Sequence, residues 1–268
     1  MPLPSPTDLF TLRGRRALVT GAGRGIGRAI ALGLAGAGAQ VALVARSAVE
    51  LDEVAALVRE GGSPASTTGT PRVVTEPADL ADTGSLAELV ETVSSRLDGV
   101  IDVVVHAAGV QARGLATELT DVDFERVLTL NLMAPWRLSK EVARRQLEAG
   151  VGGSHVMVAS MLAVTSRPEV SPYVARKTGL LGTVRALSTE WAPHGIRVNA
   201  LAPGYVATAL TSSLFAQEQW REHTLQRVPL GRFGRPEDLV GPALLLASDA
   251  GSYLTGQLLT VDGGWTSS

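Results

Sequence analysis

The chain has 268 residues, a net charge of −2 at pH 7 and no cysteine. Its length suits one α/β domain, its charge balance lacks the basic excess typical of nucleic-acid binding, and the missing thiols exclude disulfides and thiolate metal sites. No apolar run approaches the ~18 residues of a membrane span, and Met1–Asp8 shows no export signal. We therefore expect a cytoplasmic protein with no metal, nucleic-acid or membrane partner.

The predicted elements begin with a βαβ unit. Residues 1–13 contain three prolines and are expected to form an irregular lead-in. Residues 16–20 and 40–45 are short apolar runs, which we interpret as buried strands. Between them lie a glycine-rich turn and a helix that ends near Gly38. This arrangement is the one that a phosphate-binding glycine turn requires.

Strands and helices alternate through the rest of the chain. Continuous apolar strands separated by helices indicate a parallel sheet covered on both faces. We predict one Rossmann-like α/β domain over 1–268, with a doubly wound, mostly seven-stranded parallel sheet. The remaining expected strands are 72–75, 101–106, 156–159, 197–201 and 258–261, and the expected helices are 49–60, 83–96, 121–149, 173–192 and 236–248.

The glycine-rich turn, Gly21-Ala-Gly-Arg-Gly-Ile-Gly27, favours dinucleotide binding. Glycines at 21, 25 and 27 permit a tight turn and a close approach to a pyrophosphate, and the N-terminus of the helix that follows offers unpaired N–H groups to the anion. Glycine-rich turns also serve as plain connectors, but this one lies between a strand and a helix.

The residues after the second strand predict the type of dinucleotide. An NAD site usually places a carboxylate at this point, whereas an NADP site needs a cation for the 2′-phosphate. The chain has Ala45-Arg46 here, and Arg24 in the glycine turn is a second cation. We therefore predict NADP(H) in preference to NAD(H), although either arginine alone is often a plain surface residue.

Tyr173 and Lys177 are candidate proton-transfer residues. Four residues apart on a helix, their side chains share one face, and the ammonium favours the ionised phenol. Tyr173 could then exchange a proton with an alcohol or a carbonyl, and Ser160 lies thirteen residues upstream at the end of an apolar run. An isolated pair of this kind would more often decorate a helix surface.

The chain contains, in order, the motifs Thr20-Gly-x-x-x-Gly-x-Gly27, Ser160, Tyr173-x-x-x-Lys177 and Pro203-Gly204. Through these motifs it resembles the short-chain dehydrogenase/reductase family over nearly its whole length. The resemblance implies that Tyr173 is the catalytic acid/base, Lys177 supports it and holds the nicotinamide ribose, Ser160 orients the substrate and Asn131 supports a proton-relay water. It also implies further cofactor contacts, by Asp79, Leu80, Ala108, Gly109, Pro203, Gly204, Val206 and Thr208.

One segment departs from the family pattern. The family usually has Asn-Asn-Ala-Gly after the fourth strand, whereas this chain has His106-Ala-Ala-Gly109. No proton-transfer group is lost by this change. A lone histidine that ends a buried strand is usually a hydrogen-bonded structural residue, and we interpret His106 in this way.

Short matches within the family resemble the branch of gluconate 5-dehydrogenase and 2-deoxy-D-gluconate 3-dehydrogenase, which implies a sugar-acid substrate. Arg113 and Arg167 are expected near the substrate mouth, where a guanidinium can bind a carboxylate, although each could be a solvated loop residue. A polar substrate lid is expected over about 205–232. The alternatives are a ketoreductase resembling 3-oxoacyl-carrier-protein reductases and a catalytically idle NADP-binding scaffold.

We also expect a homotetramer. The helices over 121–149 and 173–192 carry apolar residues on more faces than one sheet can cover, and in the family these helices pair across a two-fold axis. The alternative is that these residues are buried within one subunit. They are Val127, Leu138, Val142, Leu181, Val184 and Leu187.

Overall fold

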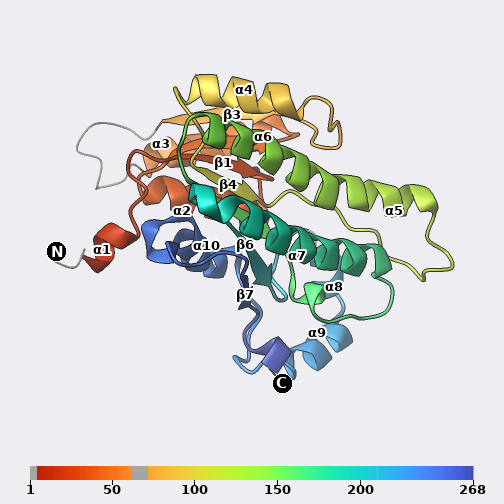
Figure 1. The fold of residues 1–268 in the computed structure, drawn as a ribbon. Helices are drawn as coiled ribbons and strands as arrows, with labels where there is room; N and C mark the ends of the chain where they lie inside the picture. The colour runs from red at the N-terminus through yellow and green to blue at the C-terminus, as the bar shows by residue number, and fades with distance from the viewer. Residues whose placement is uncertain (1–4, 62–71, 210, 268) are drawn as a thin grey trace.

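A seven-stranded parallel sheet runs through the middle of the molecule (Figure 1), with the strand order β3-β2-β1-β4-β5-β6-β7. The computed structural model describes residues 5–61, 72–209 and 211–267, so residues 1–4 of the expected lead-in and Leu210 of the expected lid lie outside the described residues. The strands are β1 (Arg16–Thr20), β2 (Gln40–Ala45), β3 (Val73–Pro77), β4 (Val103–His106), β5 (Gly153–Val158), β6 (Ile196–Pro203) and β7 (Leu258–Val261).

Helices cover both faces of the sheet. One layer contains α2 (Gly25–Gly36), α3 (Ala48–Glu60) and α10 (Val240–Ala247), and the other contains α4 (Leu86–Arg96), α6 (Ala134–Glu148) and α7 (Ser171–Trp191). The remaining helices are α1 (Pro6–Leu9), α5 (Asp121–Leu128), α8 (Ser212–Phe215) and α9 (Glu218–Leu225). In Figure 1, α8 and α9 lie with the C-terminal end below the sheet.

The strands are apolar throughout because successive side chains enter two different cores. On β1, Ala17 and Val19 pack with α2, α3 and α10, whereas Leu18 packs with α4 and α6. Met157 on β5 packs against α7 in a third cluster. This double burial is the physical reason that the sequence showed unbroken apolar runs, and it confirms the predicted sheet.

A π-helical turn interrupts the helix predicted over 121–149. Thr129–Met133 forms this turn between α5 and α6, so the prediction of one continuous helix was wrong. Hydrophobic periodicity detects a helical segment, but it does not detect one extra residue within a turn. Two smaller differences are the four-residue α1 inside the lead-in and a 3₁₀ turn, Pro236–Leu239, ahead of α10.

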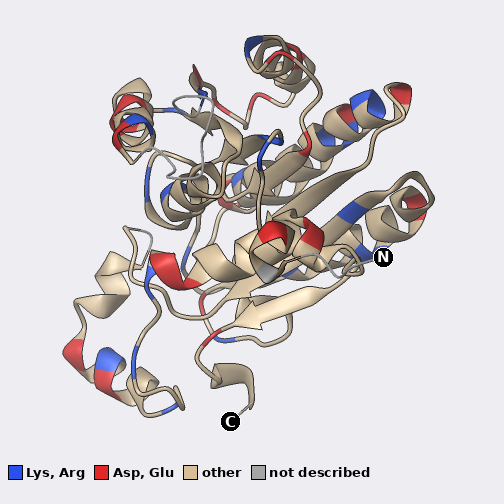
Figure 2. Cartoon of the chain, turned by 90° about the vertical axis from the view of Figure 1, so that its left-hand side faces the viewer, with Lys and Arg blue, Asp and Glu red and all other residues tan. Residues whose placement is uncertain are grey.

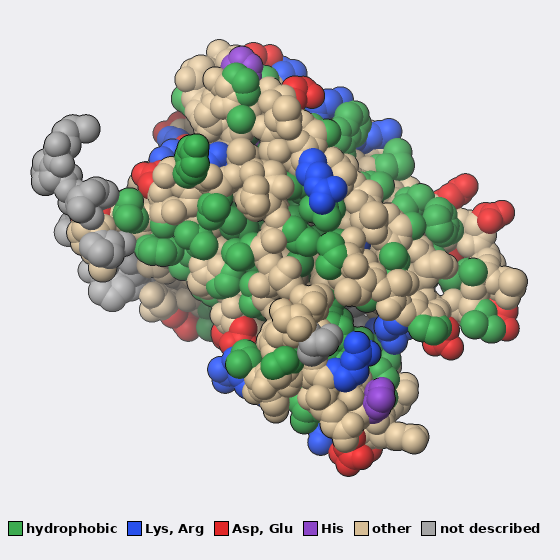
Figure 3. Space-filling view, turned by 60° about the horizontal axis from the view of Figure 1, so that its bottom comes forward, with side chains coloured by type: hydrophobic (Ala, Val, Ile, Leu, Met, Phe, Trp, Pro, Cys, Tyr) green, Lys and Arg blue, Asp and Glu red, His purple; other side chains and the backbone are tan. Residues whose placement is uncertain are grey.

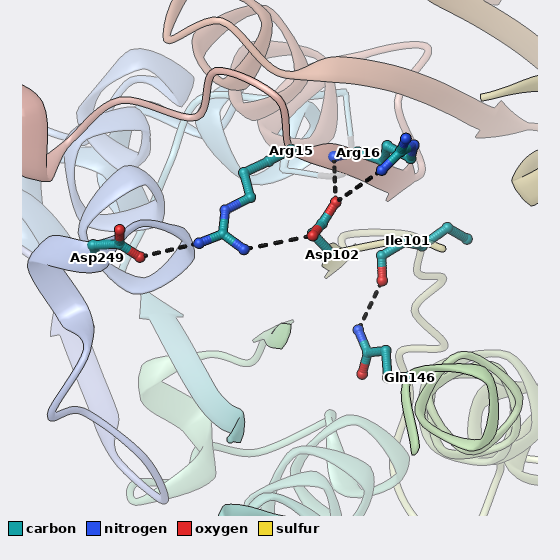
Figure 4. Close-up of polar contacts among 6 residues, drawn as sticks. All are labelled: Arg15, Arg16, Ile101, Asp102, Gln146 and Asp249. Carbon is teal, nitrogen blue, oxygen red and sulfur yellow. Dashed lines mark hydrogen bonds and ion pairs between the residues drawn. The ribbon is translucent and has the colours of Figure 1, made fainter. Parts of the chain in front are cut away.

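Ion pairs join elements at the amino ends of the central strands (Figure 4). Asp102 accepts a 2.8 Å hydrogen bond from the backbone N–H of Arg16, and the Arg15 guanidinium lies 3.5 Å from Asp102 and 3.3 Å from Asp249. Beside them, Gln146 donates to the carbonyl of Ile101. These contacts link β1, β4, α6 and the turn after α10. Elsewhere, charges of both signs are interspersed (Figure 2).

Within the ranges that the structure describes, no helix combines the length and the apolar character needed to cross a lipid bilayer.

Candidate active site

A cavity of about 770 Å³ lies at the carboxyl ends of β1, β2 and β4. In a doubly wound sheet this is where the strand order reverses and where ligands bind. Many of the predicted cofactor residues line this cavity: Gly21, Arg24, Gly25, Ile26, Gly27, Arg46, Asp79, Leu80, Ala108, Gly109 and Thr208.

Two glycines of the turn are required by its geometry. Gly21 has φ +66°, and a Cβ added there would lie 2.7 Å from the backbone nitrogen of Ala108. A Cβ added at Gly27 would lie 2.2 Å from the carbonyl oxygen of Gly21. The close approach of these backbones leaves the N-terminus of α2 open to the cavity, where its N–H groups suit a pyrophosphate.

The far end of the cavity carries the two predicted arginines. Ala45 ends β2 and supplies no carboxylate, and Arg46 is exposed, with no ion pair to any other described residue. Arg24 pairs with Glu50 at 3.5 Å, an interaction that was not anticipated from the sequence. Glu50 therefore offsets part of the charge of Arg24, and Arg46 is the better placed cation for a phosphate.

Tyr173 and Lys177 lie on the first turns of α7, which starts at Ser171 with Pro172 in its first turn. The Lys177 Nζ lies 5.6 Å from the centre of the Tyr173 ring and donates a hydrogen bond to the carbonyl of Val158. Burial, and secondarily the charge of Arg176, holds the pKa of the Lys177 ammonium well below its usual value.

Ser160 approaches the same region from the end of β5. It begins the 3₁₀ turn Met161–Ala163, and its Oγ accepts a 3.1 Å hydrogen bond from the backbone N–H of Leu162. Met161 and Leu162 form a buried cluster against which Tyr173 packs. Ser160 directly precedes, and Tyr173 packs against, the same buried cluster.

Asn131 lies in the π-helical turn, 1% exposed. Its Nδ2 donates to the carbonyls of Val127 at 2.7 Å and Val110 at 3.0 Å, and its Oδ1 accepts from the N–H of Val110 at 2.8 Å. The side chain is thus fully used in tying the helix to the segment after β4. A π turn frees local backbone groups, and such turns are frequent at functional sites.

Arg113, predicted to lie near the substrate mouth with Arg167, interacts electrostatically with Arg167, Tyr173 and Tyr205. Burial lowers the pKa of Arg113, the charge of Arg167 lowers it further, and the phenols of Tyr173 and Tyr205 oppose this shift. Arg113 donates to Gln111 through Nε at 3.0 Å and Nη2 at 2.8 Å, which fixes its orientation. The carboxylate of Glu169 also opposes the lowering of the Arg113 pKa, but more weakly than the two phenols, so the neighbouring guanidinium groups of Arg113 and Arg167 still favour an anion.

The segment 205–232 encloses an aromatic cluster, although its outer face is polar as expected. The Tyr205 ring meets Trp220 and Trp265 edge to face, with centroids 5.2 and 5.1 Å apart. Phe215 lies 4.6 Å from Phe233 and 5.7 Å from Trp220. Phe215 and Trp220 therefore anchor α8 and α9 to the body of the domain.

Five predicted cofactor residues lie outside the cavity lining: Tyr173 and Lys177, described above, and Pro203, Gly204 and Val206. Pro203 ends β6, and Gly204 approaches Asp262 so closely that an added Cβ would lie 2.7 Å from its Cα. Gly204 and Val206 line a separate cavity of about 220 Å³, and the Val206 side chain is buried in the core. Thr208 and its neighbour Ala209 line the large cavity.

His106 belongs to a buried polar chain, which agrees with the structural role expected for it. Its Nε2 lies 2.7 Å from Ser139 Oγ, which lies 3.1 Å from Nδ1 of His155, and Nε2 of His155 lies 3.1 Å from Gln146 Oε1. Because Nε2 of Gln146 donates to Ile101, its Oε1 is an acceptor, and every donor is used once when both imidazoles are neutral. Burial lowers both histidine pKa values to about 3.

Sequence reasoning missed Arg176, which lies between the candidate catalytic pair in sequence. It is 2% exposed, and its Cζ lies 4.0 Å from the centre of the Tyr173 ring. Its spacing from Tyr173 gave the only available signal, since residues three apart on a helix are neighbours. Within the described ranges, no group of three or more His, Asp or Glu residues is arranged to bind a metal.

Comparisons with known proteins agree with this geometry. The family profile described as "Enoyl-(Acyl carrier protein) reductase" matches residues 21–266. A gluconate 5-dehydrogenase of Gluconobacter oxydans is 38% identical, with 98% of each chain covered. A 3-oxoacyl-[acyl-carrier-protein] reductase of Thermotoga maritima is 37% identical, covering 94% of this chain and 98% of that one. The structure of a gluconate 5-dehydrogenase from Burkholderia cenocepacia, in complex with NADP and tartrate, is 33% identical with a TM-score of 0.89, covering 98% of this chain and all of that chain.

Proposed function

Because this chain belongs to the short-chain dehydrogenase/reductase family, whose named members act on CH–OH groups, we propose that it is an NADP(H)-dependent oxidoreductase. NADP(H) fits the residues present: the close backbone approach of Gly21 and Gly27 suits the pyrophosphate, and Arg46 with Arg24 suits the 2′-phosphate. The solved relative with NADP bound supports the same cofactor. When bound, the nicotinamide supplies hydride acceptance or donation.

In the proposed mechanism, the protein's own residues transfer the proton. In alcohol oxidation, ionised Tyr173 takes the proton of the substrate hydroxyl as the carbon gives up its hydride, and in ketone reduction the neutral phenol returns that proton. Lys177 supports the phenolate by its charge, and the hydroxyl of Ser160 holds the substrate oxygen. Asn131 fixes the π-helical turn through its hydrogen bonds to the carbonyls of Val110 and Val127.

We propose a small hydroxy or keto acid of the sugar-acid type as the substrate. The paired guanidinium groups of Arg113 and Arg167 beside Tyr173 carry this proposal, because they suit a carboxylate. The gluconate dehydrogenase relatives support it. The Thermotoga reductase favours a second candidate, reduction of a 3-oxoacyl thioester.

One substrate screen separates these functions. Gluconate-type acids, neutral polyols and 3-oxoacyl thioesters are tested side by side with NADP(H), using the parent, Arg113→Ala and Arg167→Ala. We expect the acids to react best and either substitution to raise KM for acids, costing roughly 2–5 kcal/mol if the contact is desolvated. Best activity on thioesters, unaffected by either change, would favour the reductase. No activity on any substrate would favour an idle scaffold.

The proton-transfer role is tested by Tyr173→Phe. This variant should lose most of its kcat while its Kd for NADPH, measured by fluorescence titration, stays close to that of the parent. Tyr205→Phe is the matched control, because it removes a neighbouring phenol. Unchanged turnover in Tyr173→Phe would contradict the mechanism.

We propose a homotetramer, on different residues from those first considered. Val127, Leu138, Val142, Leu181, Val184 and Leu187 are all buried within one subunit and give no support for assembly. Phe124, Met133 and Trp136 on the α5–α6 segment are instead 38–42% exposed. The face in Figure 3 carries scattered apolar side chains across its middle, with some basic side chains among them. Light scattering that gave a monomer mass of 27.9 kDa would contradict assembly.

A further inference from the structure

Arg176 is a buried cation without a counter-ion. No carboxylate of the described residues forms an ion pair with it, and its Nε has no hydrogen-bond partner among them. Burial lowers the pKa of this arginine to about 10, which measures how poorly the site solvates its charge. An unpaired buried charge lowers the free energy of unfolding, so its presence calls for a compensating use.

The position of the guanidinium suggests that use. It stacks on one side of the Tyr173 ring at 4.0 Å, and its Nη1 lies beside Gly109, where an added Cβ would come within 3.7 Å. Arg176 therefore fills the space between the ring and the wall of the large cavity. A guanidinium over an aromatic face both restrains the ring and places a permanent positive charge against it.

The charges around Tyr173 differ in permanence. On its own helix these are Lys177, whose ammonium is desolvated and repelled by Arg176, and Arg176 itself, which keeps its proton throughout the working pH range. The other titratable groups facing the site are Arg113, Arg167, Glu169 and Tyr205, which come from the segments after β4, β5 and β6. Both cations are buried, and Arg176 lies closer to the ring centre, at 4.0 Å against 5.6 Å for Lys177.

We propose that Arg176 is a positioning residue that restrains the Tyr173 ring and places a fixed positive charge beside the phenolate that alcohol oxidation uses. This inference rests on the proposed role of Tyr173 as the proton-transfer group. The phenolate is the base that oxidation needs, whereas reduction needs the neutral phenol.

The test uses Arg176→Met, which keeps the volume and removes the charge, with Arg176→Lys as the conservative variant. Arg185→Met, on the exposed face of the same helix, is the control. Tyrosine ionisation is followed by ultraviolet difference titration of the cofactor-free protein. The chain has only three tyrosines, and the signal missing from Tyr173→Phe identifies the relevant one.

In Arg176→Met we expect this signal, and the acid limb of kcat/KM for alcohol oxidation, to move up by about one pH unit, a tenfold loss on that limb. In Arg176→Lys the titration and the acid limb should stay close to those of the parent, and Arg185→Met should show no shift. We also expect the Tm of Arg176→Met to equal or exceed that of the parent, whereas a merely structural arginine would lower it when removed.

An unmoved titration in folded Arg176→Met would overturn the proposal, and so would a lower Tm combined with an unmoved acid limb. If the methionine variant does not fold, Arg176→Gln carries the same comparison. The titration needs neither substrate nor cofactor, so a parent protein that oxidises nothing would refute the proposed function while leaving the charge effect of Arg176 measurable.

Discussion

The buried pair His106 and His155 predicts that the protein loses stability in mild acid. Both pKa values fall from 6.5 to about 3 in the folded chain, because burial disfavours the imidazolium. In the unfolded chain both return to the ordinary value. Below pH 6.5 the unfolded state therefore binds two protons that the folded state excludes, and the free energy of unfolding decreases as the pH falls towards 3.

The magnitude follows from the size of these shifts. One unit of pKa shift corresponds to about 1.4 kcal/mol, so at pH 5 each histidine lowers the free energy of unfolding by roughly 2 kcal/mol, and the pair by roughly 4. This is a large part of the ~5–15 kcal/mol that stabilises a typical domain. Carboxylates contribute little in this window. Asp238, for example, has its pKa lowered to about 2, chiefly by the Arg232 hydrogen bond.

The assay is urea unfolding at pH 7.5, 6 and 5, at one fixed protein concentration. His106→Asn introduces the residue usual in the family and should reduce the pH dependence by about half, whatever it does to stability at pH 7.5. His223→Asn, at an exposed position, is the control and should leave the dependence unchanged. A free energy of unfolding that is flat between pH 7.5 and 5, or a slope unaffected by His106→Asn, would refute the reasoning.

Three further outcomes are expected. Gly27→Ala should weaken NADPH binding at least tenfold by calorimetry, because its Cβ would lie 2.2 Å from the Gly21 carbonyl oxygen and the turn must shift; an unchanged Kd would contradict this. Arg46→Asp should reverse cofactor preference, measured as the ratio of kcat/KM for NADP to that for NAD; comparable values for both cofactors in the parent would count against the 2′-phosphate site. Asp102→Ala should lower the free energy of unfolding by about 1–3 kcal/mol, since it leaves the N–H of Arg16 without its acceptor, and equal urea midpoints would show that the contact is dispensable.

The sheet could be predicted from the sequence because each strand is apolar on both faces. Residues 16–20 and 40–45 were predicted with their observed limits, since a glycine turn and polar residues bound them sharply. The cofactor cavity followed from the same pattern, because parallel strands bring their carboxyl ends, and the turns after them, to one edge.

Other parts of the site depend on contacts between distant residues, and no local pattern carries them. The pairing of Arg24 with Glu50 joins the glycine-rich turn to α3, and the chain from His106 through Ser139 to His155 joins β4, α6 and β5. For the helices, an apolar stripe indicates burial but does not say whether the partner is the chain's own sheet or another subunit. For this reason the apolar residues of α6 and α7 misled the assembly argument.

The π-helical turn at Thr129–Met133 makes this part of the chain sensitive to length. A π turn amounts to one residue inserted into an α-helix, so α6 continues about 100° out of phase with α5. Deleting a single residue here would restore a regular helix and rotate the side chain of Asn131 away from Val110. Substitutions that keep the chain length would leave that register intact. Among homologous or engineered variants, we therefore expect insertions and deletions to be excluded from this turn even where its side chains vary.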